Sequence, residues 1–217
     1  MLQLSCGGKS ITSALFLGAH SDDIEIGCGG TLQRLVAACP GAQIHWVTLS
    51  SDAVRAKETR RAAGKLLEGA KHTDIRTEAF RESFFPYTGT EIKAYFERLK
   101  QEVNPDIVFT HYRHDLHQDH RVVNELTWNT FRNHLILEYE IPKFDGDLGV
   151  PNGFSALTRA ELDRKVDVLL ECFESQRTKS WFTRDTFAAI ARLRGIECNA
   201  PEGFAEAFYV RKMALSF

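Results

Sequence analysis

Two polar clusters in the sequence hold most of the side chains that could bind a metal ion or move a proton. The first is the run His20-Ser21-Asp22-Asp23, and the second extends from Thr110 to His120. The second cluster contains half of the chain's eight histidines: His111, His114, His117 and His120. A zinc site for hydrolysis uses about three nitrogen or oxygen ligands and leaves a fourth position open for water. Together the two clusters offer enough ligands for such a site.

The spacing within the clusters is typical of side chains that share one face of a helical turn. His20 and Asp23 are three residues apart, and His117 and His120 have the same offset. The first pair together with one histidine of the second cluster completes a His/Asp/His triad. Asp22 is adjacent to a ligand but points elsewhere, which suits a general base for the attacking water.

Each cluster also has a simpler interpretation. The first could be a polar strand-to-helix turn in which a carboxylate caps the helix, and the second could be the solvated start of a helix. Neither interpretation explains both clusters at once. We expect His111, His114 and Asp115 to be loop residues or hydrogen-bond partners that fix the tautomer of a ligand imidazole, rather than ligands themselves.

Apolar runs and turn residues predict the elements that position the first cluster. Residues 14–19 and 44–49 are short apolar runs typical of strands buried on both faces. A glycine-bearing loop after the first run leads into a helix over 31–38, and another helix covers 54–67. The sequence therefore begins with an alternation of strands and helices.

The rest of the chain continues this alternation. Thr88 and Glu91 form a capping-box pattern that starts a helix, and Pro105 ends it. The remaining predicted elements are a strand at 106–110, a helix that starts at the capping-box pair Thr158 and Glu161, a helix at 185–194 closed by Gly195, and a last strand at 205–213. Segments 139–154 and 174–181 are expected to be loops that shape specificity.

Alternating elements of this kind predict a Rossmann-like α/β fold, a mostly parallel sheet with helices on both faces. We expect residues 1–217 to form a single domain. Ligands of such folds bind at the carboxyl ends of the strands. Both polar clusters follow predicted strands, so the fold is expected to bring them to one edge of the sheet.

Composition excludes several classes of protein. With 27 Lys and Arg against 29 Asp and Glu, and a net charge of −2, the chain lacks the basic excess of a nucleic-acid-binding protein. No apolar stretch is long enough to span a bilayer. The five cysteines form no CxxC motif, which fits a reducing, cytoplasmic location. The stretch Gly27-Cys28-Gly29-Gly30 departs from the G-x-G-x-x-G spacing of dinucleotide sites.

Four stretches resemble motifs of the PIG-L/LmbE family of zinc-dependent N-acetylsugar deacetylases. The stretch AHSDDIEIGCGGT at 19–31 resembles the AHPDDE signature of the family, and HQDH at 117–120 resembles its His-x-Asp-His motif. The segment from Arg55 through Ala63 is similar to its R-x-x-E-x-x-x-A-A helix, and the segment from Phe204 to Phe208 is similar to its aromatic-A-E-A-F segment. Two positions depart from the pattern. Ser21 replaces the usual proline, and Ile24 occupies the place of the usual glutamate. Neither change replaces an implied ligand, and both affect the geometry of the loop.

The resemblance implies three zinc ligands: His20, Asp23 and His120. It also implies that Asp22 is the general base and that His117 lies near the developing oxyanion or the leaving amine. Asp119 is expected to orient a histidine and, if that histidine is His117, to hold it cationic. Arg55 matches an arginine that contacts substrate in the family.

The function implied by the resemblance is that of a hydrolase with one Zn²⁺ per chain, or Fe²⁺ in its place. It would remove the acetyl group from an N-acetylated amino sugar, such as an N-acetylglucosamine derivative, or from a small glycoconjugate, and release acetate. Two alternatives stay open: a zinc amidase acting on a non-sugar N-acyl compound, and a non-catalytic Rossmann-like binding module. A homo-oligomer is one expected state, because members of the family often self-associate.

Overall fold

A single sheet forms the centre of the fold. The computed structural model describes residues 11–214, and within them seven strands pair in the order β3-β2-β1-β4-β5-β7-β6. The strands are β1 (Ser13–His20), β2 (Gln43–Ser50), β3 (His72–Thr77), β4 (Ile107–His111), β5 (Leu135–Tyr139), β6 (Gly153–Leu157) and β7 (Phe204–Tyr209). Strands β1 to β5 run parallel, whereas β7 is antiparallel to both of its neighbours, β5 and β6.

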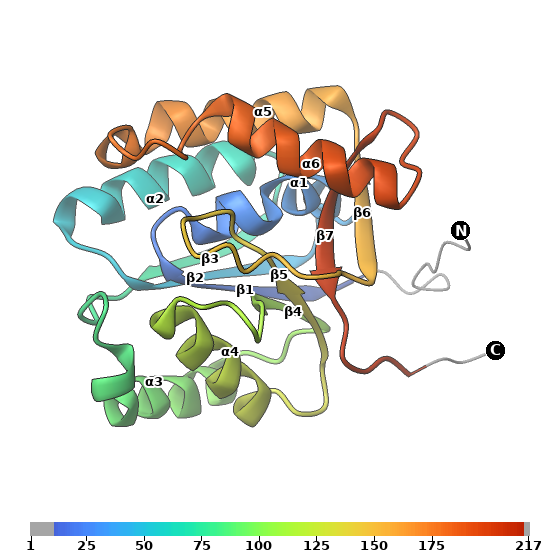
Figure 1. The fold of residues 1–217 in the computed structure, drawn as a ribbon. Coiled ribbons are helices and arrows are strands. Elements are labelled where there is room, and N and C mark those ends of the chain that lie inside the picture. Colours follow the sequence, from blue (N-terminus) through green and yellow to red (C-terminus); the bar gives the residue numbers. More distant parts are fainter. Residues whose placement is uncertain (1–10, 215–217) are drawn as a thin grey trace.

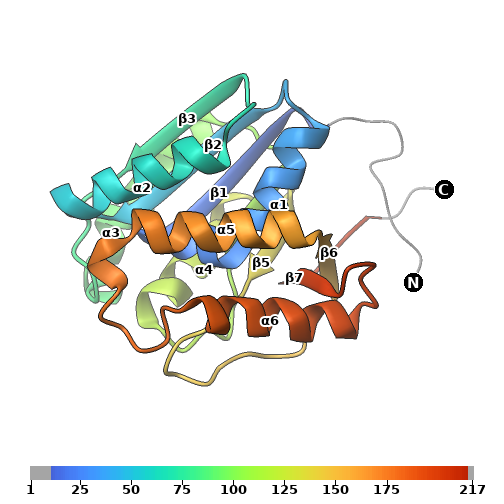
Figure 2. The ribbon, with the colours of Figure 1, turned by 90° about the horizontal axis from the view of Figure 1, so that it is seen from above.

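Helices cover both faces of this sheet. They are α1 (Asp23–Ala38), α2 (Ala53–Leu66), α3 (Gly89–Glu102), α4 (Gln118–Thr130), α5 (Arg159–Cys172) and α6 (Arg184–Glu197). Figure 1 shows α1, α2, α5 and α6 on one face and α3 and α4 on the other. In Figure 2, α5 lies between α2 and α6. The predicted α/β class, a mostly parallel sheet between two helical layers, is confirmed.

Side chains of the central strands alternate between two apolar cores. Phe16 of β1 packs into the core beneath α1, α2, α5 and α6, where it stacks on Phe109 of β4. Leu15 and Leu17 point to the opposite side and pack in the core beneath α3 and α4. Because successive strand residues face opposite sides and both sides are covered, the central strands read as continuous apolar runs.

The order of the strands places a crevice at the ends of β1 and β4. From β1 the chain moves outward to β2 and β3, and it then returns to β4 on the other side of β1. Such a reversal leaves an open crevice at the carboxyl ends of the two central strands. His20 ends β1 and His111 ends β4, so both polar clusters begin at this crevice.

Several elements differ from those predicted. The glycines at 27–30, expected in a loop, lie inside α1. Strands β3, β5 and β6 are additional to the predicted set. Thr88 is the N-cap of α3 but its side chain makes no capping hydrogen bond, so that capping box is wrong, whereas the capping box of Thr158 and Glu161 at α5 is confirmed.

Gly195 does not end α6, which continues to Glu197. The glycine serves close packing instead, because a Cβ at this position would lie 2.2 Å from the carbonyl oxygen of Gly203. A residue that must be small for packing and a residue that caps a helix look the same in the sequence.

Helix α1 is broken at Cys28, whose backbone leaves the helical region at φ −148°. A buried ion pair occupies the break. Lys165 of α5 donates to the carbonyl of Ile26 at 2.6 Å and to Glu206 of β7 at 2.6 Å. The Glu206 carboxylate also accepts from two backbone N–H groups that begin the second part of the helix, those of Gly30 and Thr31. A cation at the end of one helical segment and an anion at the start of the next match their dipoles.

We expect the Lys165→Met variant to lose about 3–5 kcal/mol of unfolding free energy, because it leaves the Glu206 carboxylate buried without its cation. Urea unfolding followed by circular dichroism measures this loss. The control is Lys65→Met, which removes an ammonium that pairs with Glu171 at the exposed surface and should leave the stability nearly unchanged. Equal losses of stability in the two variants would contradict the stabilising role given to the buried pair of Lys165 and Glu206.

Two further expectations concern the described residues as a group. No helix within residues 11–214 combines the length and apolar character needed to cross a bilayer. Four of the five cysteines lie in this range and are free thiols; Cys6 lies outside it.

Candidate metal centre

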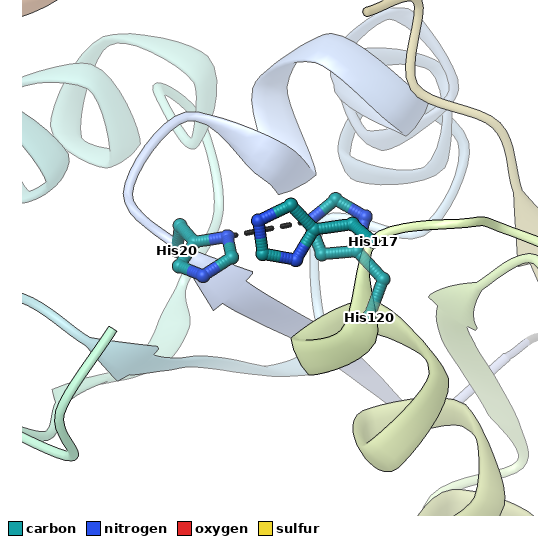
Figure 3. A group of neighbouring side chains, drawn as sticks. All are labelled: His20, His117 and His120. Carbon is teal, nitrogen blue, oxygen red and sulfur yellow. Dashed lines mark hydrogen bonds between the residues drawn. The ribbon is translucent and has the colours of Figure 1, made fainter. Parts of the chain in front are cut away.

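The two polar clusters meet at the crevice between β1 and β4. His20 is the last residue of β1, and Asp23 begins α1 directly after it. His117 is the N-cap of α4, and His120 lies in the first turn of the same helix. Figure 3 shows His20 at the tip of β1 facing the two histidines of α4. His20 and His120 are 100 residues apart in the chain, yet their rings are in hydrogen-bonding contact.

Three of these side chains have the spacing of metal ligands. His20 Nδ1 lies 3.2 Å from His120 Nε2 and 3.5 Å from Asp23 Oδ2. His120 Nε2 lies 3.6 Å from Asp23 Oδ1. Ligands held tetrahedrally at 2.0–2.1 Å from Zn²⁺ are about 3.3–3.4 Å from one another. The separations of His20, Asp23 and His120 are close to this spacing, and the two contacts of Asp23 use different carboxylate oxygens.

Buried carboxylates set the tautomers of both ligand imidazoles. His120 Nδ1 is 2.9 Å from Asp115 Oδ2, and His20 Nε2 is 3.0 Å from Asp119 Oδ2. Because an ionised carboxylate only accepts hydrogen bonds, each ring donates its outer N–H to a carboxylate and turns its other nitrogen toward the other ring. One nitrogen of each ring and the Asp23 carboxylate thus converge, and either a proton on His20 or a bound cation would offset the repulsion between their lone pairs.

The electrostatics of the centre favour positive charge at this point. Burial lowers the pKa of His20, but hydrogen bonds to Asp119 and Asp23 outweigh it and raise the pKa to about 10. Burial lowers the pKa of His120 to about 3, which keeps that ring neutral. Although burial opposes it, the neighbouring histidines His120, His111 and His20 hold the pKa of Asp23 well below its usual value. Binding of a divalent cation to these residues would release the proton of His20.

Two neighbouring histidines come close enough to serve as ligands but have their lone pairs occupied. Ligand atoms of His20, His117 and His120, and those of Asp23, His111 and His120, lie within 4.8 Å of one another. The backbone N–H of Ala19 donates to His111 Nε2 at 2.9 Å, however, and that of Asp119 donates to His117 Nδ1 at 3.3 Å.

The unoccupied lone pairs belong to His20, Asp23 and His120. Two imidazoles and one carboxylate suit Zn²⁺ and also Fe²⁺. The donor set therefore fits the metal that the sequence motifs imply.

Asp22 lies beside these three residues and has the acidity of a general base. It has a left-handed backbone (φ 97°) and lines the same cavity as the three residues. Burial raises the pKa of Asp22 to about 7, although the nearby charge of Arg55 lowers it. Arg55 Nη2 lies 3.2 Å from Asp22 Oδ1 and also donates to the carbonyl of Ser21. The Arg55 side chain is only 11% exposed and lies against the centre.

Asp119 orients His20 and not His117. Besides His20, the Asp119 carboxylate accepts from the backbone N–H groups of Ser83 at 2.6 Å and Phe85 at 3.2 Å. The histidine that Asp119 contacts is therefore His20, and the condition under which Asp119 would hold His117 cationic is not met. Burial lowers the pKa of His117, and its Nδ1 accepts a backbone hydrogen bond. In this neutral ring Nε2 carries the proton and is a hydrogen-bond donor.

A cavity of about 170 Å³ opens beside the centre. Its inner wall contains the ligands, Asp22, Arg55 and His117, and its outer wall comes from both segments expected to shape specificity. From these segments the lining residues are Ile141, Lys143, Phe144, Asp145, Lys179 and Trp181. The inner wall offers reactive groups, and the outer wall offers aromatic and charged surface.

Some residues of the centre are not identified by the motifs. Asp115 lies in the second cluster, and its contact with a ligand is one of the roles left open by the sequence. Lys143 and Glu82 carry no signal, because each lies in a loop without a motif and reaches the centre only through the fold. His114 lies outside the centre, where its ring packs edge-on against Tyr112.

The amino-acid sequence matches the profile of one known family. The family is described as PIG-L: GlcNAc-PI de-N-acetylase, and the match covers residues 15–131. This span includes both polar clusters. Comparison with curated proteins gives no significant match.

The fold is similar to those of several solved structures. The conserved protein TT1542 from Thermus thermophilus matches with a TM-score of 0.72 and 22% identity over 94% of this chain and 96% of that one. N,N'-diacetylchitobiose deacetylase from Pyrococcus horikoshii has a TM-score of 0.67 and 21% identity over 92% and 84% of the two chains. The zinc-inhibited form of teicoplanin deacetylase Orf2 has a TM-score of 0.70 and 16% identity over 92% and 97%.

Proposed function

This chain belongs to the GlcNAc-PI de-N-acetylase (PIG-L) family, and on that premise we propose that it is a metal-dependent hydrolase that removes the acetyl group from an N-acetylated amino sugar or a small glycoconjugate. The observation that carries the proposal is the convergence of His20, Asp23 and His120 beside a carboxyl group, Asp22, whose pKa is about 7. The deacetylases of similar fold support the same class of substrate.

The three convergent side chains would hold Zn²⁺ or Fe²⁺. When bound, the cation supplies Lewis acidity, which polarises the amide carbonyl and makes water easier to deprotonate. The remaining work falls to the protein. Asp22 takes one proton from the attacking water and gives it to the departing amine. The new C–O bond replaces the C–N bond, and the products are acetate and a free amino sugar.

Two other residues of the cavity support this exchange. His117 is neutral and offers Nε2–H as a donor, so we assign it to the carbonyl oxygen as negative charge develops there. Arg55 holds Asp22 in place through their contact of 3.2 Å. Its position on the cavity wall also lets it face the substrate, as the family resemblance implies.

The test is acetate release by purified protein that carries one equivalent of Zn²⁺ or Fe²⁺. Zinc is limited to one equivalent because the similar teicoplanin deacetylase has a zinc-inhibited form. We expect turnover of N-acetylglucosamine glycosides or N,N'-diacetylchitobiose and little turnover of N-acetylated amino acids. Activity on the amino acids alone would favour an amidase with a non-sugar substrate. Metal binding without any turnover would favour a binding module.

A further inference from the structure

We propose that Lys143 is a positioning residue that joins the loop walling the cavity to the metal ligand His120, with Asp115 as the link between them. This inference rests on the metal site of the proposed function. The loop consists of residues 140–152, between β5 and β6, and is called here the cavity loop. It supplies Phe144 and Asp145 to the wall of the cavity.

One oxygen of Asp115 serves both neighbours. Asp115 Oδ2 lies 2.9 Å from His120 Nδ1 and 3.0 Å from Lys143 Nζ. The side chains are buried, with exposed fractions of 2% for Asp115, 3% for His120 and 8% for Lys143. The ligand imidazole and the loop ammonium therefore compete for, and jointly orient, the same carboxylate oxygen.

Lys143 also holds its own loop. Its ammonium lies 2.5 Å from Asp147 Oδ2, and the same oxygen of Asp147 accepts the backbone N–H of Leu116 at 2.6 Å. Leu116 follows Asp115 directly. The cavity loop is consequently fastened to the segment that begins α4 by two carboxylates with one cation between them.

The ammonium has no capacity left for a substrate. A lysine has three N–H donors, and Lys143 Nζ has three acceptors within reach: Asp115, Asp147 and, at 3.5 Å, the carbonyl of Ile141. Lys179, which lines the same cavity, forms no ion pair among the residues that the structure describes. A role in holding other groups thus distinguishes Lys143 from the other lysine of the cavity.

Removing the Lys143 charge is expected to affect metal affinity in two opposite ways, and the sign of the net change distinguishes its possible roles. A cation near the metal repels it, so a lysine that acted only through charge would weaken metal binding, and its removal would tighten it. Loss of positioning works the other way, because Asp115 and Asp147 then face each other without a cation and His120 loses its fixed orientation. Changes to groups that orient a ligand typically cost about 10–100-fold in metal affinity.

Coupling through Asp115 must also act in the reverse direction. If the contact of Lys143 with Asp115 strengthens metal binding, metal binding must stabilise that contact, and with it the described position of the cavity loop, by the same factor. We therefore expect Zn²⁺ to slow amide hydrogen exchange in residues 140–152 of the wild-type protein. This readout needs neither substrate nor turnover.

The experiment compares Lys143→Met, Lys143→Arg and the matched control Lys179→Met, with zinc affinity measured by chelator competition and hydrogen exchange measured with and without zinc. We expect Lys143→Met to bind zinc about 10–100-fold more weakly and to lose the zinc-dependent protection of the loop. Lys143→Arg should recover most of both properties, because it restores the charge. Lys179→Met should bind zinc at least as tightly as the wild type, because it removes a cation from the cavity and leaves Asp115 in place.

A second variant keeps the proposal testable if Lys143→Met fails to fold. Asp147→Asn leaves the contact of Lys143 with Asp115 and weakens the hold on the loop, so zinc affinity should stay near wild type while loop protection falls. Unchanged or tighter zinc binding by Lys143→Met, or loop protection that still responds to zinc, overturns the proposal. Neither result depends on deacetylase activity, whose absence would count against the proposed function alone.

Discussion

Replacing Asp22 by asparagine is expected to lower kcat by about 10²–10⁴-fold, the usual contribution of a general base, while the protein keeps its metal. The pKa of about 7 lets Asp22 accept a proton near neutral pH, and an amide cannot do so. The measurement is steady-state acetate release together with metal analysis of the same samples. The substitution should leave KM nearly unchanged, because the amide still fits beside Arg55.

Asparagine is also the most suitable substitution for the backbone. Asp22 has φ 97°, and asparagine tolerates positive φ better than other residues with a side chain, glycine excepted. A fall in kcat therefore cannot be attributed to a distorted turn. If Asp22→Asn retained the wild-type kcat, Asp22 would not be the base, and the proton would have to pass through another group of the cavity.

Replacing His120 by alanine is expected to remove nearly all bound metal and, with it, turnover. The His120 ring supplies one of the three proposed ligands of the metal. Alanine leaves only His20 and Asp23, and two protein ligands hold a metal ion much more weakly than three. Metal content after gel filtration, measured by elemental analysis, checks this expectation. The fold should survive, because Asp115 keeps its ion pair with Lys143 at 3.0 Å.

The matched control is His114→Ala in the same histidine-rich segment. His114 is exposed and its ring contacts Tyr112 rather than the centre, so this variant should keep wild-type metal content. Equal metal loss in both variants would mean that the segment as a whole, and not a specific ligand, governs binding. Wild-type metal content in His120→Ala would remove the proposed ligand set.

The part of the fold that carries the centre is predictable because its strands are buried on both faces. Residues 14–19 and 106–110 are apolar runs followed at once by polar residues, and β1 and β4 pair in the structure with Phe16 opposite Phe109. Strand β3 (His72–Thr77) is not predictable in this way. It lies at the edge of the sheet and is half exposed, and Ile75 is its only large apolar residue. Its pairing with β2 is made by backbone hydrogen bonds, which the pattern of side chains does not reveal.

The centre is predictable only as far as motifs and short spacings extend. His20, Asp23 and His120 belong to such motifs, and the structure brings them together. The partner of Asp119 cannot be read from the sequence, because residues next to each other on a helix start point in different directions. Its carboxylate turns from His117 toward His20, which only the pairing of β1 with β4 brings near. Lys143 reaches Asp115 through the same long-range geometry.

The inner and outer walls of the cavity separate the residues proposed to act on the substrate from the residues expected to select it. Every proposed ligand and proton carrier lies between residues 20 and 120, whereas the outer wall belongs to two loops later in the chain. We therefore expect exchange of Phe144 or Trp181 to change which substrates are accepted and to leave the proposed chemistry intact. Lys143 should be kept in any such exchange, because a replacement loop without this lysine is expected to weaken metal binding as well.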